Sequence, residues 1–273
     1  MSNVLERTLG IFELLARHGE GLELANIADT LHIPRSAAHR LLGELARYGY
    51  VRQPRELGAY MLTTKLTSLG LSFLSHSGIT DFSQPLLDRL AASSGELVRL
   101  SVVDGARLTW VARAQGARQG LRYDPDMGSD ARLSCSSSGI AWMSALTDDE
   151  AIALASGQGM GQRADYGPNA PKNLKEMMKY VKEARTRGFS ITIDTYTSGL
   201  SAMAAVVQPI GGAPIGAISI AGPTVRFTEQ RMQALGAELI EVAAQMAAAS
   251  GTSPFFQKST HGGPPSRLPI YAA

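Results

Sequence analysis

The sequence of 273 residues contains one cysteine, Cys135, and no long apolar run. A single cysteine excludes an intrachain disulfide framework and a cysteine-based zinc cluster. No stretch approaches the ~18 consecutive apolar residues of a membrane-spanning helix. The first seven residues lack the basic patch and the apolar stretch of a secretory signal. We therefore expect a soluble cytoplasmic protein with no membrane contact, no metal and no cofactor.

Histidine is missing where an enzyme would need a base. The chain has five histidines, and none of them lies within residues 77–260. A nucleophilic serine or cysteine is usually activated by such a base. The segment Cys135-Ser-Ser-Ser-Gly139 also differs from the Gly-x-Ser-x-Gly elbow of serine hydrolases. A hydrolase using this serine-rich segment is the alternative that we weigh, but we expect no enzyme and no catalytic residue, with Cys135 as a small buried side chain.

Charge is unevenly distributed near the N-terminus. Residues 1–30 hold two cations and five acids, a net charge of −3, whereas residues 31–65 hold six cations and two acids, a net charge of +4. A basic face on one small domain is suited to an anionic polymer. A solvated basic face would look the same, so the interpretation depends on where the cations lie.

The spacing of apolar residues predicts helices over residues 4–17, 24–31 and 34–48. Two helices separated by a short break, here His32-Ile-Pro34, form a helix-turn-helix, whose second helix enters the major groove. Strand-like residues 50–53 and 59–63 around a turn predict a basic wing. The DNA-contacting candidates are Arg35, Ser36, His39 and Arg40 on the second helix, with Arg52, Arg55 and Tyr60 of the wing near the flanking backbone. Arg47 is assigned to a solvated pair with Glu44.

The rest of the chain alternates helical and strand-like segments. Helices are predicted over 65–77, 81–94, 139–146, 148–155, 174–187 and 228–249, and strands over 97–103, 107–112, 120–123, 189–194, 202–209 and 214–221. This order indicates an α+β domain, an antiparallel sheet with segregated helices. We expect a winged helix-turn-helix domain over 1–64, a linker helix over 65–77, an effector-binding domain over 78–250 and a flexible tail over 251–273.

The chain resembles the IclR family of bacterial transcription regulators over nearly its whole length except the tail. The motifs that carry the resemblance are Leu24-Ala-Asn-Ile-Ala, Pro34-Arg-Ser-Ala-Ala-His-Arg-Leu-Leu, Leu133-Ser-Cys-Ser-Ser-Ser-Gly, Arg187-Gly-Phe, Gly199-Leu-Ser-Ala-Met-Ala-Ala and Ile218-Ser-Ile-Ala-Gly-Pro. The resemblance implies a GAF-like effector domain, a homodimer or homotetramer, and binding to a double-stranded DNA operator tuned by a small metabolite, often an organic acid. Ile140, Ala202 and Ala221 stand where many members carry polar residues, which implies a less polar pocket here.

The effector candidates centre on the serine-rich segment. Hydroxyls and free N–H groups at a helix start can seat a carboxylate, although serine is also an ordinary N-cap residue. With the resemblance, this predicts effector contacts from Ser136, Ser137, Ser138 and Gly139, from Arg122, Tyr123 and Met127 of the preceding loop, and from Ser219 of the sheet. Trp110 is assigned to the core. A DNA binder that senses nothing remains a second alternative, and the sequence does not distinguish repression from activation.

Overall fold

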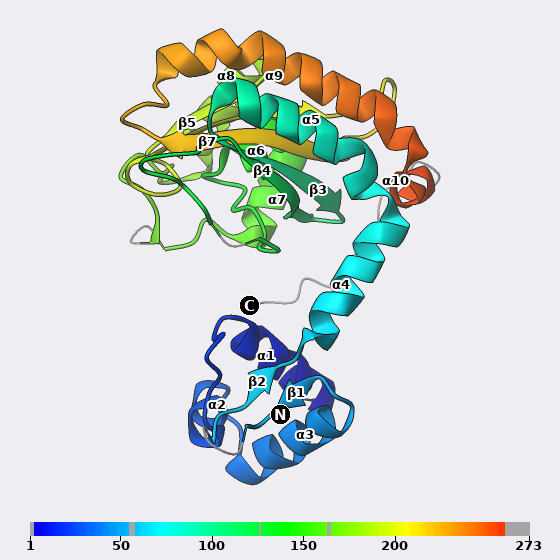
Figure 1. Cartoon of the computed structure of the whole chain (residues 1–273). Coiled ribbons are helices and arrows are strands. Elements are labelled where there is room, and N and C mark those ends of the chain that lie inside the picture. The colour runs from blue at the N-terminus through cyan, green and yellow to red at the C-terminus, as the bar shows by residue number, and fades with distance from the viewer. Residues whose placement is uncertain (1–2, 55–57, 126, 163–164, 260–273) are drawn as a thin grey trace. The chain divides into compact units, whose positions relative to one another are not determined.

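The computed structural model describes residues 3–54, 58–125, 127–162 and 165–259. The chain divides into two compact units, Met1–His76 and Ser77–Ala273 (Figure 1). Each unit has its own hydrophobic core. Across the described ranges, no helix is both long enough and apolar enough to cross a membrane.

The N-terminal unit is a three-helix domain with a short β-ribbon. Its elements are α1 (Val4–Ala16), α2 (Leu24–Thr30), α3 (Arg35–Arg47), β1 (Val51–Arg52), β2 (Met61–Leu62) and α4 (Thr64–Ser77), which reaches just into the second unit. Asn3 caps α1 in a capping box with Glu6, which satisfies N–H groups that the first turn leaves free. The amphipathic faces of α1, α2 and α3 meet in one cluster with Val51 of the ribbon, as the apolar spacing predicts.

The end of α3 is set by Gly49, whose φ of 75° lies in the left-handed region. The N–H of Tyr50 donates to the carbonyl of Leu45, and that of Gly49 donates to the carbonyl of Ala46. This is the Schellman pattern, which closes a helix and turns the chain sharply. The ammonium of Lys65 also donates to the carbonyl of Tyr48 at 2.7 Å, so α3 is held at its C-terminal end.

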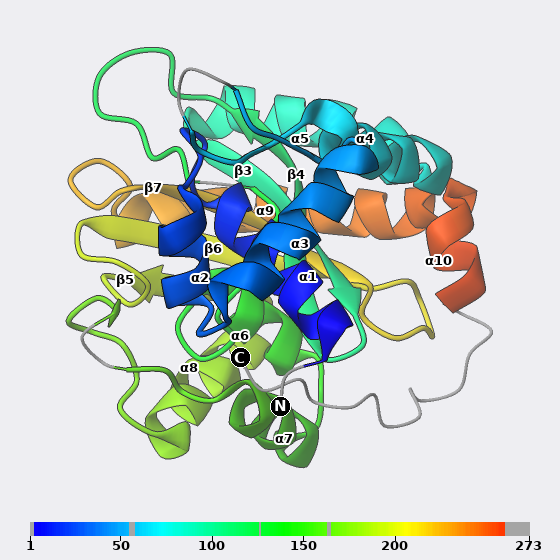
Figure 2. The same cartoon turned by 90° about the horizontal axis from the view of Figure 1, so that it is seen from below.

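The C-terminal unit is an antiparallel sheet of five strands in the order β4-β3-β7-β6-β5. The strands are β3 (Leu97–Asp104), β4 (Arg107–Gln115), β5 (Ser190–Ile193), β6 (Leu200–Val207) and β7 (Gly216–Pro223). Helices α5 (Ile79–Ser94) and α9 (Glu229–Ala249) cover one face (Figure 1). Helices α6 (Ser137–Ser144), α7 (Asp148–Gln158) and α8 (Leu174–Arg187) are grouped together (Figure 2) and form a second core cluster with β4. The expected α+β fold is confirmed.

The two faces of the sheet differ in side-chain size. The face under α5 and α9 carries large apolar residues such as Leu100, Ile218 and Met203. On the other face, Ala204 and Ala217 pack against Ala141 of α6. Such small side chains let the helix backbone approach the sheet closely. The hydroxyl of Ser190 donates to the carbonyl of Ser137 at 2.8 Å and fastens the start of α6 to β5.

Two expectations about secondary structure are wrong. Residues 120–123, predicted as a strand, lie in irregular backbone, because Gly120 adopts a positive φ and no neighbouring strand pairs with the segment. Residues 250–259, assigned largely to a flexible tail, form a 3₁₀ turn (Ser250–Thr252) and α10 (Pro254–Ser259). Phe256 of α10 is buried in the core of the C-terminal unit. The glycine and proline around it led to the prediction of a flexible tail.

Candidate functional site

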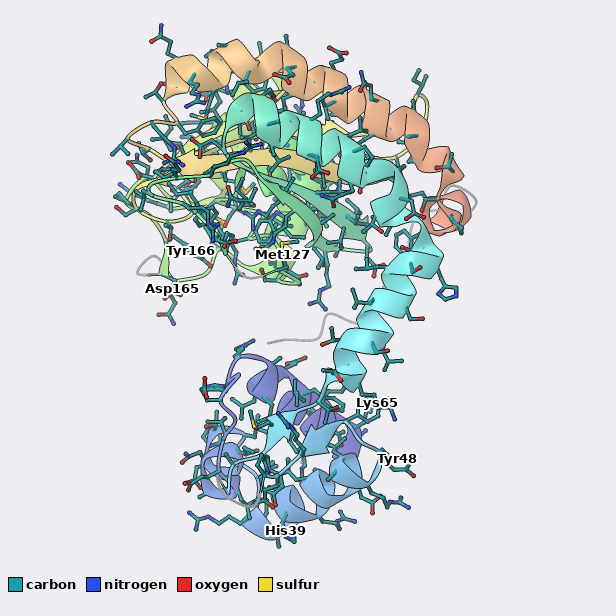
Figure 3. All side chains as sticks on the ribbon, viewed as in Figure 1. His39, Tyr48, Lys65, Met127, Asp165 and Tyr166 are labelled. Atoms are coloured by element: carbon teal, nitrogen blue, oxygen red, sulfur yellow. The ribbon has the colours of Figure 1, made fainter. Side chains whose placement is uncertain are left out.

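Helix α3 has one buried face and one fully exposed face. Ala38, Leu41, Leu42 and Leu45 face the core. Arg35, Ser36, His39 and Arg40 are all exposed, as expected, and His39 projects away from the rest of its unit (Figure 3). The N-terminal half of α3 therefore presents two guanidinium groups, a hydroxyl and an imidazole to solvent on a rigid helix.

The cations of α3 differ in how far their charge is already compensated. Arg40 makes no ion pair or side-chain hydrogen bond with any described residue. Arg35 lies 3.6 Å from Asp29, but both side chains are mostly exposed, and such pairs are worth only ~0.2–1 kcal/mol. Arg47 pairs with Glu44 at 2.7 Å and lies over the ring of Tyr48, as expected for a solvated helix-end cation. The uncompensated charge is thus at the start of the helix.

Of the wing candidates, Arg52 is exposed on β1, as expected. Arg55 lies outside the described residues. Tyr60 is a correction: its side chain is 6% exposed and packs in the core of the N-terminal unit. Its backbone exchanges two hydrogen bonds with Leu22, which turns the ring inward. Tyr60 is therefore a core residue at the base of the wing, where its buried ring does not suit the contact with DNA that was expected of it.

The second candidate site is a small hollow in the C-terminal unit, at the N-terminus of α6. Arg99, Trp110, Ser136, Ser137, Thr192, Tyr196, Leu200 and Ala202 line it. Ser136 is the N-cap of α6, and its hydroxyl accepts a hydrogen bond from the N–H of Gly139 at 3.1 Å. The space open to the centres of water-sized spheres is about 20 Å³, enough for a water molecule.

Of the residues that the structure describes, Arg99 is the only charged one that lines this hollow. It is 6% exposed, and its guanidinium lies 3.9 Å from the centre of the Trp110 ring and 5.8 Å from that of Tyr123. Among the described residues, no acidic group pairs with it and no acceptor binds its Nε. Burial lowers the pKa of Arg99, and Tyr123 and Tyr196 partly oppose that shift. The hollow therefore holds a desolvated cation that lacks a counter-charge in the described structure.

The expected effector residues divide into those near the hollow and those away from it. Ser136 and Ser137 line it, and Tyr123 lies beside Arg99. Gly139 is not part of the lining. Its N–H donates to the hydroxyl of Ser136, and a Cβ there would lie 2.5 Å from Cα of Leu133. Close packing against Leu133 therefore requires glycine at position 139.

The other expected residues also lie outside the lining. Ser138 is buried, and its hydroxyl has no partner among the described residues. Arg122 is exposed and pairs with Asp124 at 2.9 Å. Met127 packs against the cluster of α6, α7 and α8 (Figure 3), and the buried hydroxyl of Ser219 lies 3.5 Å from the carbonyl of Arg99.

Sequence reasoning missed Arg99, Thr192, Tyr196 and Leu200 as lining residues. Trp110, assigned to the core, is buried as expected and also forms part of the wall. The available signal was Arg99 itself, a cation inside the otherwise apolar run of residues 97–103. A charge within a strand buried on both faces requires a partner, and that partner can be a ligand.

The chemistry of the serine-rich segment does not favour nucleophilic catalysis. Burial raises the pKa of Cys135 to about 12, so its thiolate is scarce at neutral pH. Thr195 donates to the carbonyl of Cys135 and Ser190 donates to that of Ser137, both contacts that hold backbone. Over the described ranges, no three His, Cys, Asp or Glu residues are grouped as metal ligands would be.

Comparison with known proteins gives two family matches. The model for the IclR helix-turn-helix domain matches residues 4–55, and that for the bacterial transcriptional regulator IclR C-terminal domain matches residues 71–248. The acetate operon repressor of Salmonella typhimurium is 29% identical over 248 residues, covering 90% of this chain and 89% of the relative. The HTH-type transcriptional repressor AllR of Salmonella paratyphi A is 25% identical over 253 residues, covering 93% and 92%.

Solved structures share the fold. An IclR transcriptional regulator from Alicyclobacillus acidocaldarius has a TM-score of 0.78 at 20% identity, covering 92% of this chain and 100% of that one. An IclR homolog from Microbacterium hydrocarbonoxydans, complexed with 4-hydroxybenzoate, has a TM-score of 0.74 at 16% identity, covering 92% and 100%. The two family matches together cover both units of the fold described above. The chain belongs to the IclR family of bacterial transcriptional regulators.

Proposed function

We propose that the protein is a transcription regulator that binds an operator through α3 and whose operator affinity is tuned by a small organic acid in the hollow at α6. The observation that carries the proposal is the pairing, in one chain, of an uncompensated cationic helix face with a hollow containing the buried cation Arg99. Two of the relatives are named as repressors, and we extend repression to this chain.

On the DNA side, the exposed face of α3 supplies the contacts. Arg35 and Arg40 suit bidentate contact with guanine or clamping of phosphates, and Ser36 and His39 reach base edges or phosphates. Arg52 and Arg55 of the wing neutralise flanking phosphates. A homodimer, or a homotetramer of two such pairs, presents two copies of α3 and prefers an inverted repeat with half-sites one helical turn apart, or a multiple of it.

On the sensing side, the effector shifts a population of conformations. A ligand that binds one conformation of the C-terminal domain more tightly changes the spacing of the paired recognition helices through α4. A coupling of ~1–3 kcal/mol between the two sites is ordinary for such a switch. The relative complexed with 4-hydroxybenzoate shows that an organic acid can occupy a protein of this fold.

The test begins with genome-wide mapping of the sites that the protein binds in its source organism. The mapped operator then serves in fluorescence anisotropy titrations, while a thermal-shift screen of small organic acids identifies ligands. We expect that an acid that raises the melting temperature also changes operator affinity by about 5–150-fold.

Two results would contradict the proposal. Operator binding that responds to no acid that the protein binds would favour a DNA binder without a sensing role. Turnover of ester or amide substrates by the purified protein would favour the hydrolase alternative, and we expect none.

A further inference from the structure

Arg99 lies on the face of the sheet that α6 covers. In the strand register, Arg99 is opposite Ser219 of β7, and Ser219 is opposite Ala204 of β6. Directly opposite residues in antiparallel strands share a face, and Ala204 packs against Ala141 of α6. The guanidinium of Arg99 therefore extends from a row of small side chains, close to the start of α6, where Ser136 and Ser137 line the same hollow.

Two nitrogen donors of the side chains that line the hollow lack an acceptor in the described part of the chain. The Nε of Arg99 and the indole nitrogen of Trp110 are both buried without an acceptor among the described residues. Burial lowers the pKa of Arg99 most, Tyr123 and Tyr196 raise it, in part through a side-chain hydrogen bond with Tyr123, and the cation Arg113 lowers it further. A buried cation without a counter-charge carries a large desolvation cost, which a bound anion would offset.

Further donors and short apolar walls surround the guanidinium. The hydroxyls of Ser136 and Ser137 lie at the hollow, and of the first-turn N–H groups of α6 that of Gly139 is already bound by the hydroxyl of Ser136. Leu200, Ala202 and the ring of Tyr196 complete the lining. The arrangement offers one charged contact, several neutral donors and a small apolar surface.

We propose that Arg99 is the residue that recognises the effector, by binding the single carboxylate of a short-chain acid whose apolar tail packs against Trp110, Leu200 and Ala202. This inference rests on the proposed sensing function and adds the recognition residue and the class of ligand.

Size and charge define that class. The free space of about 20 Å³ holds about one water molecule, so a two- to four-carbon acid needs the smallest displacement of the lining side chains. An aromatic acid would have to displace the walls supplied by β6 and α6. A dicarboxylate would place its second charge against apolar side chains, because the part of the lining that the structure describes has no second cation. The ligand is therefore a short-chain monocarboxylate.

The test uses the full-length protein with sodium propionate as the probe. Thermal shift and calorimetric titration at constant ionic strength compare propionate with its uncharged analogue propanamide, and with succinate and 4-hydroxybenzoate. The variants are R99Q, which removes the charge, and R99K, which keeps it. The matched control is R113Q, because Arg113 is the register partner of Arg99 on β4 but is exposed and paired with Asp124 at 2.7 Å.

We expect propionate to bind the wild-type protein and propanamide, succinate and 4-hydroxybenzoate to bind at least about 10-fold more weakly. R99Q should lose about 30-fold or more of the propionate affinity, as expected when one member of a buried charge pair is removed. R99K should keep the preference for propionate over propanamide, and R113Q should stay within about threefold of wild type. R99Q should melt no lower than the ligand-free wild type, because it removes an uncompensated buried charge.

The inference would be overturned by wild-type protein that does not bind propionate or binds propanamide equally well, or by R99Q that binds propionate like wild type. A lower melting temperature of R99Q, with unchanged ligand preference in R99K and R99Q, would mark Arg99 as structural. Operator affinity without ligand is measured in parallel. If the protein binds its operator specifically while substitution of Arg99 leaves ligand binding unchanged, the assignment of Arg99 is wrong and the proposed function stands. If operator binding is non-specific, the proposed function fails.

Discussion

Replacing Arg40 or Arg47 of α3 by alanine is predicted to have unequal effects on operator binding, although the two residues are seven positions apart on one helix. Arg40 is exposed and has no charged partner among the described residues, whereas Arg47 is neutralised by Glu44 at 2.7 Å. Removing Arg40 therefore removes a net positive charge from the face of α3 that we propose contacts DNA. Removing Arg47 frees the carboxylate of Glu44 near the C-terminal end of the helix, away from the residues that we propose contact the bases.

The magnitude depends on the role of Arg40. Each phosphate contact contributes about −0.9 to the slope of log affinity against log salt, so a wild-type dimer with ~6 contacts should show a slope of about −5. Losing one contact in each half-site changes that slope by about 1.8, which makes the affinity defect about 12-fold larger at 50 mM salt than at 200 mM. A contact to guanine instead costs ~1–3 kcal/mol per half-site at every salt concentration and relaxes the preference at one base pair.

The assay is fluorescence anisotropy of labelled operator DNA with R40A, R47A and wild-type protein at salt concentrations between 50 and 200 mM. R40A should weaken binding at least about 10-fold at 50 mM, with one of the two salt signatures. R47A should stay within about threefold, and both variants should melt near wild type because exposed substitutions change stability by about 0.5 kcal/mol or less. If R40A binds within twofold of wild type, or if R47A is the weaker variant, our placement of DNA on α3 is refuted.

Three further predictions concern side chains whose roles the structure separates. Because Tyr60 packs in the core, Y60A should lose ~3–5 kcal/mol of stability, measured by urea unfolding. Y60F keeps the ring and should keep the operator affinity of the wild type. A large binding defect in Y60F would mean that the hydroxyl contacts DNA. With a pKa of about 12, the thiolate of Cys135 is ~10⁻⁴ populated at pH 8. Alkylation of Cys135 by iodoacetamide should therefore be ~10³-fold slower than alkylation of a free thiol, and its rate should increase with pH. Fast labelling of the folded protein would contradict this burial. A Cβ on Gly139 would lie 2.5 Å from the backbone of Leu133, so G139A should lower the free energy of unfolding by ~1–3 kcal/mol or more. S138A should be neutral or stabilising, because the hydroxyl of Ser138 has no described partner. Equal melting temperatures for the two variants would contradict this packing.

The helices could be predicted from sequence because their signals are local. The apolar spacing of α3 and α8 lies within single segments, and Gly49 and Gly188 mark their ends with positive φ values. Strand pairing is not local, so the sheet order β4-β3-β7-β6-β5 could not be derived from the run of strands. The α+β class followed from the order of elements, and its finer topology required the structure.

A candidate site could be predicted from sequence where its residues lie in one segment of the chain, and not where they come from several segments. The exposed face of α3 follows from one helical period, and it was expected correctly for Arg35 and Arg40. Tyr60 was misplaced because a two-residue strand carries too little alternation to show which face is buried, and the bridge to Leu22 decides it. The hollow joins residues from β3, β4, α6 and β6, so Arg99 was missed although its charge in an apolar strand was visible.

The most direct test of the central claim, that α3 reads a specific DNA sequence, is the affinity of the full-length protein for its mapped operator relative to a scrambled duplex of the same composition. At physiological salt we predict that the operator binds at least about 10³-fold more tightly, as sequence-specific regulators do. A ratio near one for wild-type protein would show that the cationic face of α3 binds nucleic acid without reading it, and would contradict the account.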